Sequence, residues 1–144
     1  MIKSIRHTGI VVRNLEKAAN FYRSIGFVDY LTAIEISNFI DQVTGLKNAK
    51  LEWIKLKAPD GSLLELLKYH SHNEDKEILN QNSFTLGISH IAFTVEDIDE
   101  ISNLILLNGG SVVNPPAISP DKKVKVLYCH DLEGVLLEIV EELN

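Results

Sequence analysis

The pattern of apolar and polar positions in the first half of the chain recurs in the second half. In each half, a short β-branched segment precedes an amphipathic segment of helical period, and three further apolar segments follow. The first half predicts strands at 7–12, 28–33, 51–56 and 63–69 and a helix at 17–24; the second predicts strands at 89–95, 111–113, 124–129 and 135–140 and a helix at 98–107. The order βαβββ, present twice, predicts an α+β fold of two tandem modules.

The residues themselves repeat. The segment that begins at His7 matches the segment that begins at His90, 83 residues further on, whereas Glu65 matches Glu138 at an offset of 73. The first half therefore carries ten additional residues, which we place within 34–48 as a short helix or lid. Matching helix caps and turn glycines support the alignment: Asn14 with Asp97, Gly26 with Gly109, and Gly61 with Gly134.

These offsets also predict how the chain is divided. Residues 1–72 form the first βαβββ module, with its insertion, and residues 85–144 form the second. The polar stretch 73–84 is the linker between them. We expect the two modules to make up one structural domain overall.

Two histidines and two glutamates stand out, and they occupy equivalent positions in the two halves. Strand alternation places small residues on the face that His7 and His90 share with their neighbours, which leaves open volume in front of each ring. Glu65 and Glu138 lie inside otherwise apolar strands, where a carboxylate without a partner costs several kcal/mol. Two imidazoles and two carboxylates together suit a divalent first-row metal ion and leave coordination positions for a substrate.

Structural explanations remain open for each of these residues. A histidine in a strand is often hydrogen-bonded without binding a ligand, and each glutamate could pair with Lys55, Lys57 or Lys125, or face solvent. The occurrence of all four at repeat-equivalent positions favours the metal site. Less favoured candidates for a functional role are Trp53 and Tyr69, as walls of a cleft, and His70, His72 and His130, in proton transfer.

Composition narrows the classes of partner. The chain has 144 residues and a net charge of −6, which disfavours nucleic acid and anionic membrane surfaces as partners. Its single cysteine, Cys129, excludes an internal disulfide, and no segment approaches the length of a membrane span. We therefore expect a cytoplasmic protein that acts on a small molecule.

Several segments resemble the vicinal oxygen chelate superfamily, which includes glyoxalase I, bleomycin-resistance proteins, methylmalonyl-CoA epimerase and extradiol dioxygenases. The segments are 7–12, 21–27 and 89–95 and the strands that contain Glu65 and Glu138. The resemblance implies an incomplete mixed-sheet barrel around a metal, with His7, Glu65, His90 and Glu138 as ligands. It also implies a homodimer.

Within this superfamily, the glutamate at position 65 makes the chain resemble glyoxalase I most. By this resemblance, the chain is expected to be a metal-dependent lyase or isomerase, similar to lactoylglutathione lyase. It would abstract a proton next to a carbonyl through a metal-chelated enediolate or enolate, with Glu65 or Glu138 as the base. The substrate would offer two neighbouring oxygens to one divalent ion, and the candidate ions are nickel, cobalt, zinc, manganese and iron. The alternatives are an Fe(II) extradiol dioxygenase and a non-catalytic, resistance-type binding protein.

Overall fold

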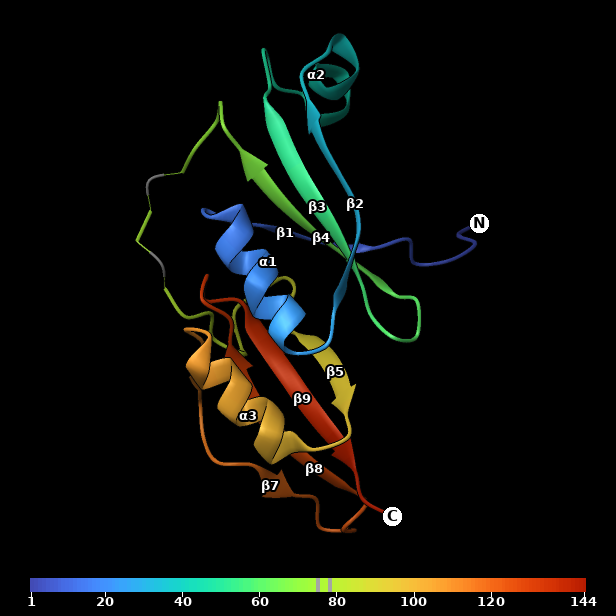
Figure 1. Cartoon of the computed structure of the whole chain (residues 1–144), viewed down its shortest axis with the longest axis vertical. Helices are drawn as coiled ribbons and strands as arrows, with labels where there is room; N and C mark the ends of the chain where they lie inside the picture. Colours follow the sequence, from blue (N-terminus) through green and yellow to red (C-terminus); the bar gives the residue numbers. More distant parts are fainter. Residues whose placement is uncertain (75, 78) are drawn as a thin grey trace. The chain divides into compact units, whose positions relative to one another are not determined.

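The chain forms two compact units, each with its own mixed sheet, in the computed structural model (Figure 1). The structure describes residues 1–74, 76–77 and 79–144; Asp75 and Ile78, which both belong to the predicted linker, lie outside the described residues. The units comprise Met1–Lys76 and Glu77–Asn144. Both have the predicted βαβββ plan, so the α+β fold is confirmed, and neither sheet closes into a barrel. Among the described residues, no helix has the length and apolar character that crossing a membrane requires.

The first unit is a four-stranded sheet with the order β1-β4-β3-β2. Strand β1 runs parallel to β4, and the other neighbours are antiparallel. Helix α1 contacts β3 and β4 and buries Phe21 and Tyr22 almost completely. The elements are β1 (Thr8–Val11), α1 (Leu15–Ser24), β2 (Val28–Glu35), α2 (Asn38–Thr44), β3 (Leu51–Lys57) and β4 (Leu63–Tyr69).

The second unit repeats this arrangement with the strand order β5-β9-β8-β6, and β7 pairs with β8. Strand β5 runs parallel to β9, as β1 does to β4. Helix α3 contacts β6, β8 and β9. The elements are β5 (Ile91–Val95), α3 (Ile98–Leu107), β6 (Ser111–Val112), β7 (Ala117–Ile118), β8 (Val124–His130) and β9 (Leu136–Glu142).

The predicted caps of both long helices are present. The side chain of Asn14 accepts the backbone N–H of Lys17, and that of Asp97 accepts those of Asp99 and Glu100. Capping of this kind satisfies N–H groups that the first helical turn leaves without partners. Gly26 and Gly109 follow the helix ends with φ angles of +111° and +88°, as predicted for glycines that close a helix.

Differences from the predicted boundaries are small, with one exception. Strand β1 begins at Thr8, one residue after its predicted start, and β5 begins at Ile91, two residues after its predicted start. Strand β7 was not predicted, because two residues in a polar segment give no detectable alternation. The predicted turn glycines lie in matching hairpin loops: the N–H of Ala58 donates to the carbonyl of Ser62, and that of Asp131 donates to the carbonyl of Val135.

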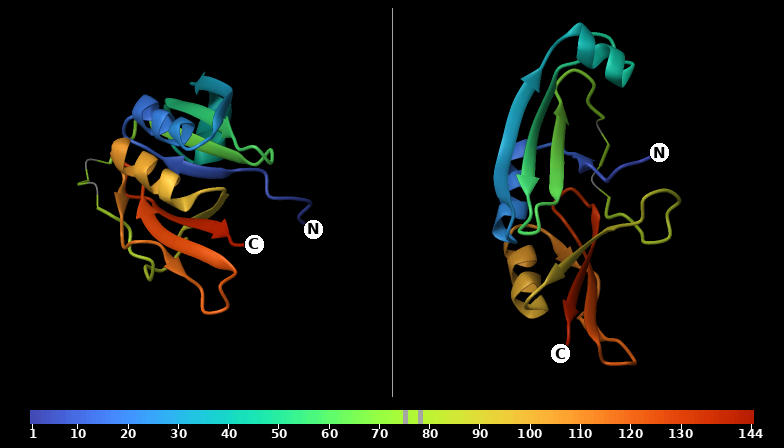
Figure 2. Two further views of the ribbon diagram at one scale, coloured as in Figure 1. Left: turned by 60° about the horizontal axis from the view of Figure 1, so that its bottom comes forward. Right: turned by 90° about the vertical axis from the view of Figure 1, so that its right-hand side faces the viewer.

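The insertion forms the short helix α2, as one of the two predicted options, and lies beyond the ends of β2 and β3 (Figures 1 and 2). Ile40 is buried in a small cluster with Ala49 and Leu51. The carboxylate of Asp41 accepts the backbone N–H groups of Asn48 and Ala49, both at 2.8 Å. These contacts fasten the helix to the start of β3.

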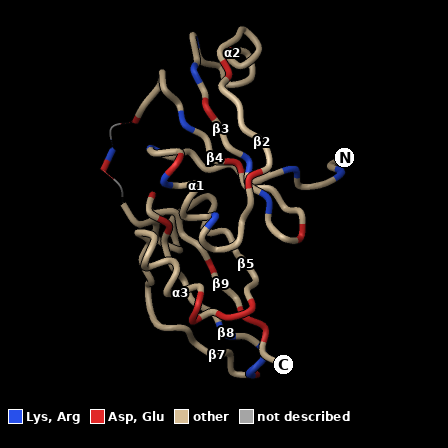
Figure 3. Tube along the Cα trace, viewed as in Figure 1, with Lys and Arg blue, Asp and Glu red and all other residues tan. Residues whose placement is uncertain are grey.

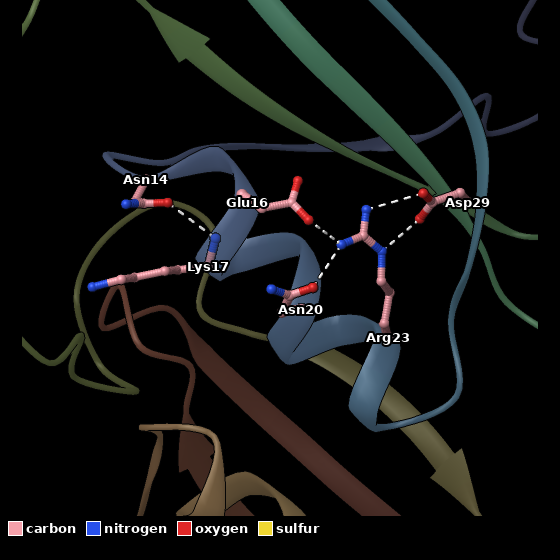
Figure 4. A network of polar contacts seen from close by, with 6 residues as sticks. All are labelled: Asn14, Glu16, Lys17, Asn20, Arg23 and Asp29. Atoms are coloured by element: carbon pink, nitrogen blue, oxygen red, sulfur yellow. Dashed lines mark hydrogen bonds and ion pairs between the residues drawn. The ribbon is translucent and has the colours of Figure 1, made fainter.

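A network of polar side chains joins the last turn of α1 to the start of β2 (Figure 4). The guanidinium of Arg23 donates through Nε and Nη2 to both oxygens of Asp29, at 2.7 and 2.9 Å. Nη1 donates to Glu16 and Asn20, at 2.6 and 2.7 Å. Because two parallel bonds fix the geometry of the pair, this contact holds the helix end against the strand.

Replacing Arg23 with methionine is expected to lower the free energy of unfolding by about 1 kcal/mol at neutral pH, as for an exposed bidentate pair. The guanidinium holds the pKa of the Asp29 carboxyl below its ordinary value. The contribution of the pair is therefore full above the unfolded-state pKa of about 3.9 and is lost as pH falls through the lower folded-state pKa. Denaturant unfolding of both proteins should show the difference shrinking below about pH 4. Lys17→Met, which removes an exposed cation from the same helix, is the control and should cost little.

Candidate metal-binding residues

In the first unit, His7 and Glu65 come together from adjacent strand segments. His7 immediately precedes β1, and Glu65 lies in the middle of β4, where it is in register with Gly9. The imidazole Nε2 lies 3.0 Å from Oε2 of the glutamate. Glu65 is only 8% exposed, so the carboxylate is buried among the leucines of its strand, as the sequence indicates.

The second unit contains the same pair at the equivalent position. His90 immediately precedes β5, and Glu138 lies in β9, in register with Ala92. Here Nε2 lies 3.1 Å from Oε2. Each parallel pairing of a first and a last strand thus positions one imidazole against one carboxylate, and this juxtaposition occurs once in each unit.

Glu65 has a second partner. Lys55, opposite Glu65 on β3, places its Nζ 3.3 Å from Oε1, the oxygen that does not face His7. The same ammonium lies 4.5 Å from the centre of the Trp53 ring. The lysine pairing that the sequence left open for Glu65 is therefore present, together with the histidine pairing.

The second unit has Tyr128 where the first has Lys55. Tyr128 lies opposite Glu138 on β8, and its ring centroid is 5.2 Å from that of His90. Lys125 pairs with Asp99 rather than with Glu138, in a part of the unit rich in acidic residues (Figure 3). Among the described residues, His90 is the ion-pairing partner found for Glu138. Sequence reasoning missed Tyr128, although its offset of 73 from Lys55 marks the equivalence.

The second nitrogens of the two histidines have different surroundings. Nδ1 of His90 lies 3.1 Å from the hydroxyl of Ser89. Nδ1 of His7 is buried and has no hydrogen-bond partner among the described residues. Because an imidazole that binds a metal through one nitrogen carries its proton on the other, Ser89 is positioned to orient His90 as a ligand.

The remaining histidines make other contacts. His70 pairs with Glu52 at 2.7 Å, and Nδ1 of His72 lies 2.8 Å from the Ser71 hydroxyl. Nε2 of the buried His130 lies 2.8 Å from the carbonyl of Gln81. Within residues 1–74, 76–77 and 79–144, no group of three or more histidine, cysteine, aspartate or glutamate side chains could by itself hold a metal ion. Each unit contains one contacting His–Glu pair.

The predicted cleft aromatics and the insertion lie on the face of the sheet that carries Lys55 and Glu65. Trp53 and Tyr69 alternate with residues of the opposite face, and both pack against the cluster of Ile40. Phe39 is 68% exposed. The helix α2 thus covers the apolar part of this face through Ile40.

Cys129 is a core residue of the second unit. It lies on β8, is fully buried and forms no disulfide. Burial, with a further contribution from the charge of Asp131, raises the pKa of its thiol to about 12. The thiol is therefore protonated at neutral pH and does not act as a nucleophile.

The donor chemistry of the two pairs fits a divalent first-row ion. Nitrogen and carboxylate oxygen are common ligands of such ions. Two donor atoms, each about 2.1 Å from one ion and at right angles to each other, lie about 3.0 Å apart. Separations of 3.0 and 3.1 Å suit this arrangement, and they equally suit a direct hydrogen bond between imidazole and carboxylate.

Comparisons with known proteins agree with this architecture. The chain matches a solved glyoxalase family protein from Bacillus cereus with a TM-score of 0.92 and 27% identity, over 100% of this chain and 97% of the other. Fosfomycin resistance protein FosX from Listeria monocytogenes has the same fold, with a TM-score of 0.63 and 17% identity over 99% and 96% of the two chains. No curated protein sequence matches. The model of the Glyoxalase/Bleomycin resistance protein/Dioxygenase superfamily matches residues 4–139, and the chain belongs to this superfamily.

Proposed function

We propose that the chain is a metal-dependent lyase or isomerase of the glyoxalase I type, with His7, Glu65, His90 and Glu138 as ligands of one divalent ion. The observation that carries the proposal is the recurrence of a His–Glu pair, at 3.0 and 3.1 Å, at equivalent positions of the two units. A structural salt bridge needs no such recurrence. The duplicated pair supports the assignment of all four residues as ligands.

The chemistry proposed is removal of a proton from a carbon next to a carbonyl. When bound, the ion would supply a positive charge that stabilises the negative charge developing on the substrate oxygens. Glu65 or Glu138 would accept the proton and return it to the adjacent carbon, which gives an isomerisation. His7 and His90 would bind the ion through Nε2, beside the carboxylate oxygens that these nitrogens contact.

The comparisons support a small substrate with two neighbouring oxygens. A solved glutamate-to-glutamine variant of FosX is a complex with Mn(II) and 1S,2S-dihydroxypropylphosphonic acid, a molecule with hydroxyls on adjacent carbons. That protein is 18% identical to this chain, with a TM-score of 0.62. We extend from it only the type of ligand, a metal ion with a vicinal dioxygen compound.

The first test is metal binding by the purified protein. After treatment with a chelator, the protein should take up one equivalent of Co(II), Ni(II), Zn(II), Mn(II) or Fe(II) per chain, as measured by equilibrium dialysis and elemental analysis. His7→Gln should weaken this binding by about 10-fold or more because it removes a ligand. His72→Gln, which changes an exposed histidine outside both pairs, should bind the ion as the parent does.

Activity assays then separate the classes of function. A hemithioacetal, an acyl-CoA, a catechol and fosfomycin should be offered with and without the ion. Conversion of the hemithioacetal supports the proposal. Oxygen consumption with the catechol supports the Fe(II) dioxygenase instead, and ligand binding that is indifferent to chelators supports the non-catalytic binding protein.

One observation favours the binding protein as the second candidate. Because Lys55 and His7 together satisfy both oxygens of Glu65, a metal ion is not required to keep this carboxylate buried. Metal uptake below stoichiometric amounts in the dialysis experiment would select this candidate.

We further propose that the protein is a cytoplasmic homodimer. Size-exclusion chromatography with light scattering tests the dimer, and fractionation of the source cells tests the compartment.

A further inference from the structure

The two His–Glu pairs are equivalent in the repeat but are not equally constrained. Glu65 is held at both oxygens, Oε2 by His7 and Oε1 by Lys55. Glu138 is held at Oε2 by His90, and its strand neighbour at the position of Lys55 is Tyr128. The side chain of Glu138 is 26% exposed, compared with 11% for Glu65.

We propose that Lys55 is a positioning residue, which holds Glu65 so that a single oxygen, Oε2, is presented beside His7 as a metal donor. The inference rests on the proposed function, since it concerns how one of the four ligands binds the ion. It assigns different behaviour to the two glutamates. Glu65 is a fixed ligand with one oxygen available, and Glu138 can bind through one or both oxygens.

The contacts of Lys55 favour positioning over competition with the metal. Its ammonium contacts Oε1, whereas His7 contacts Oε2, so the lysine and an ion beside His7 use different oxygens. Lys55 is itself restrained, because its side chain is 18% exposed and its ammonium lies over the Trp53 ring. A ligand whose second oxygen is already bonded loses less conformational freedom when it binds an ion.

The burial and charge of Glu65 also favour a positioning role for Lys55. A buried glutamate flanked by the buried Leu64 and Leu66 needs a fixed partner to remain in one rotamer. Lys55 supplies a cation directly across the strand pair, in register with Glu65. In the second unit, the aromatic ring of Tyr128 contacts His90 instead, so there the restraint acts on the histidine.

The experiment measures Co(II) binding by variants of residue 55 in the full chain. Lys55→Met keeps an unbranched side chain and removes the ammonium that lies over the Trp53 ring. It should weaken Co(II) affinity by about 10- to 100-fold, the range found when a residue that orients a ligand is lost, and change the visible absorption spectrum of the bound ion. Lys57→Met is the matched control on the same strand, since Lys57 lies 3.9 Å over the Tyr30 ring and contacts neither glutamate. It should bind Co(II) with unchanged affinity and spectrum.

The outcomes distinguish this proposal from the function on which it rests. Absence of stoichiometric Co(II) uptake by the parent protein overturns the metal site as a whole. Normal uptake by the parent, with equal or tighter uptake by Lys55→Met, overturns the role of Lys55 alone, and tighter uptake means that the ammonium competes with the ion. Lys55→Arg, which restores a cation at Oε1, should recover most of the affinity and the parent spectrum. Should Lys55→Met not fold, Lys55→Ala, which also removes the ammonium, takes its place, and parent-like affinity and spectrum in that variant overturn the proposal.

Discussion

Replacing Glu138 with glutamine is expected to lower kcat by about 100- to 10,000-fold and to weaken metal binding at the same time. The carboxylate would serve both as a ligand and, in the proposed chemistry, as an acceptor of the substrate proton. Glutamine keeps the size of the side chain but removes its charge and its basicity. The measurements are steady-state turnover of the hemithioacetal, or of whichever substrate the assays identify, and Co(II) affinity by equilibrium dialysis.

Glu142→Gln is the matched control for this variant. Glu142 lies at the end of the same strand, β9, and is exposed. The substitution removes the same charge from the chain, so a general electrostatic effect would appear in both proteins. Full turnover in Glu138→Gln would contradict the role of Glu138 in catalysis. Equal losses in both variants would show that turnover falls because the chain has lost a negative charge, and not because it has lost this carboxylate.

The largest expected effect on stability comes from Gly134→Ala. The glycine has a φ of +83°, and a Cβ atom there would lie 2.5 Å from the carbonyl oxygen and 3.0 Å from the carbonyl carbon of Leu79. This segment is held in place by a hydrogen bond from the N–H of Gln81 to the carbonyl of Gly134, at 2.8 Å. Because the clash is with backbone, relief requires the segment to move, and we expect a loss of about 3 kcal/mol or more in denaturant unfolding.

Gly61 provides an internal control, because it occupies the equivalent turn of the first unit. Its φ is +90°, and a Cβ atom would have no neighbour within 4 Å. Gly61→Ala should therefore cost only the strain of the left-handed conformation, about 1–2 kcal/mol. Equal losses in the two alanine variants would show that strain alone, and not the contact with residues 79–81, makes Gly134 necessary.

Much of the fold was predictable because the repeat tests each local assignment twice. Asn14 and Asp97 are both predicted helix caps, and Gly26 and Gly109 are both predicted to follow helix ends. A wrong assignment in one half would therefore have disagreed with the equivalent assignment in the other. The short strand β7 had no such support. It has only two residues, Ala117 and Ile118, which are too few to show an alternation of apolar and polar positions.

The candidate site was predictable as far as residue types and repeat positions allow. His7 with Glu65, and His90 with Glu138, were expected together, and each pair is in contact within its unit. The orientation of the side chains was not predictable. Whether Lys55, Lys57 or Lys125 reaches a glutamate depends on register and rotamer, and only the pairing of β3 with β4 selects Lys55.

The burial of Cys129 makes the chain its own reporter of unfolding. As the only thiol of the protein, and one that is inaccessible and protonated in the folded state, it should react with an alkylating reagent only when β8 separates from its neighbours. The labelling rate then measures how often the second unit opens, without any engineered probe. The same experiment on Gly134→Ala would show whether its lost stability is concentrated in that half of the molecule.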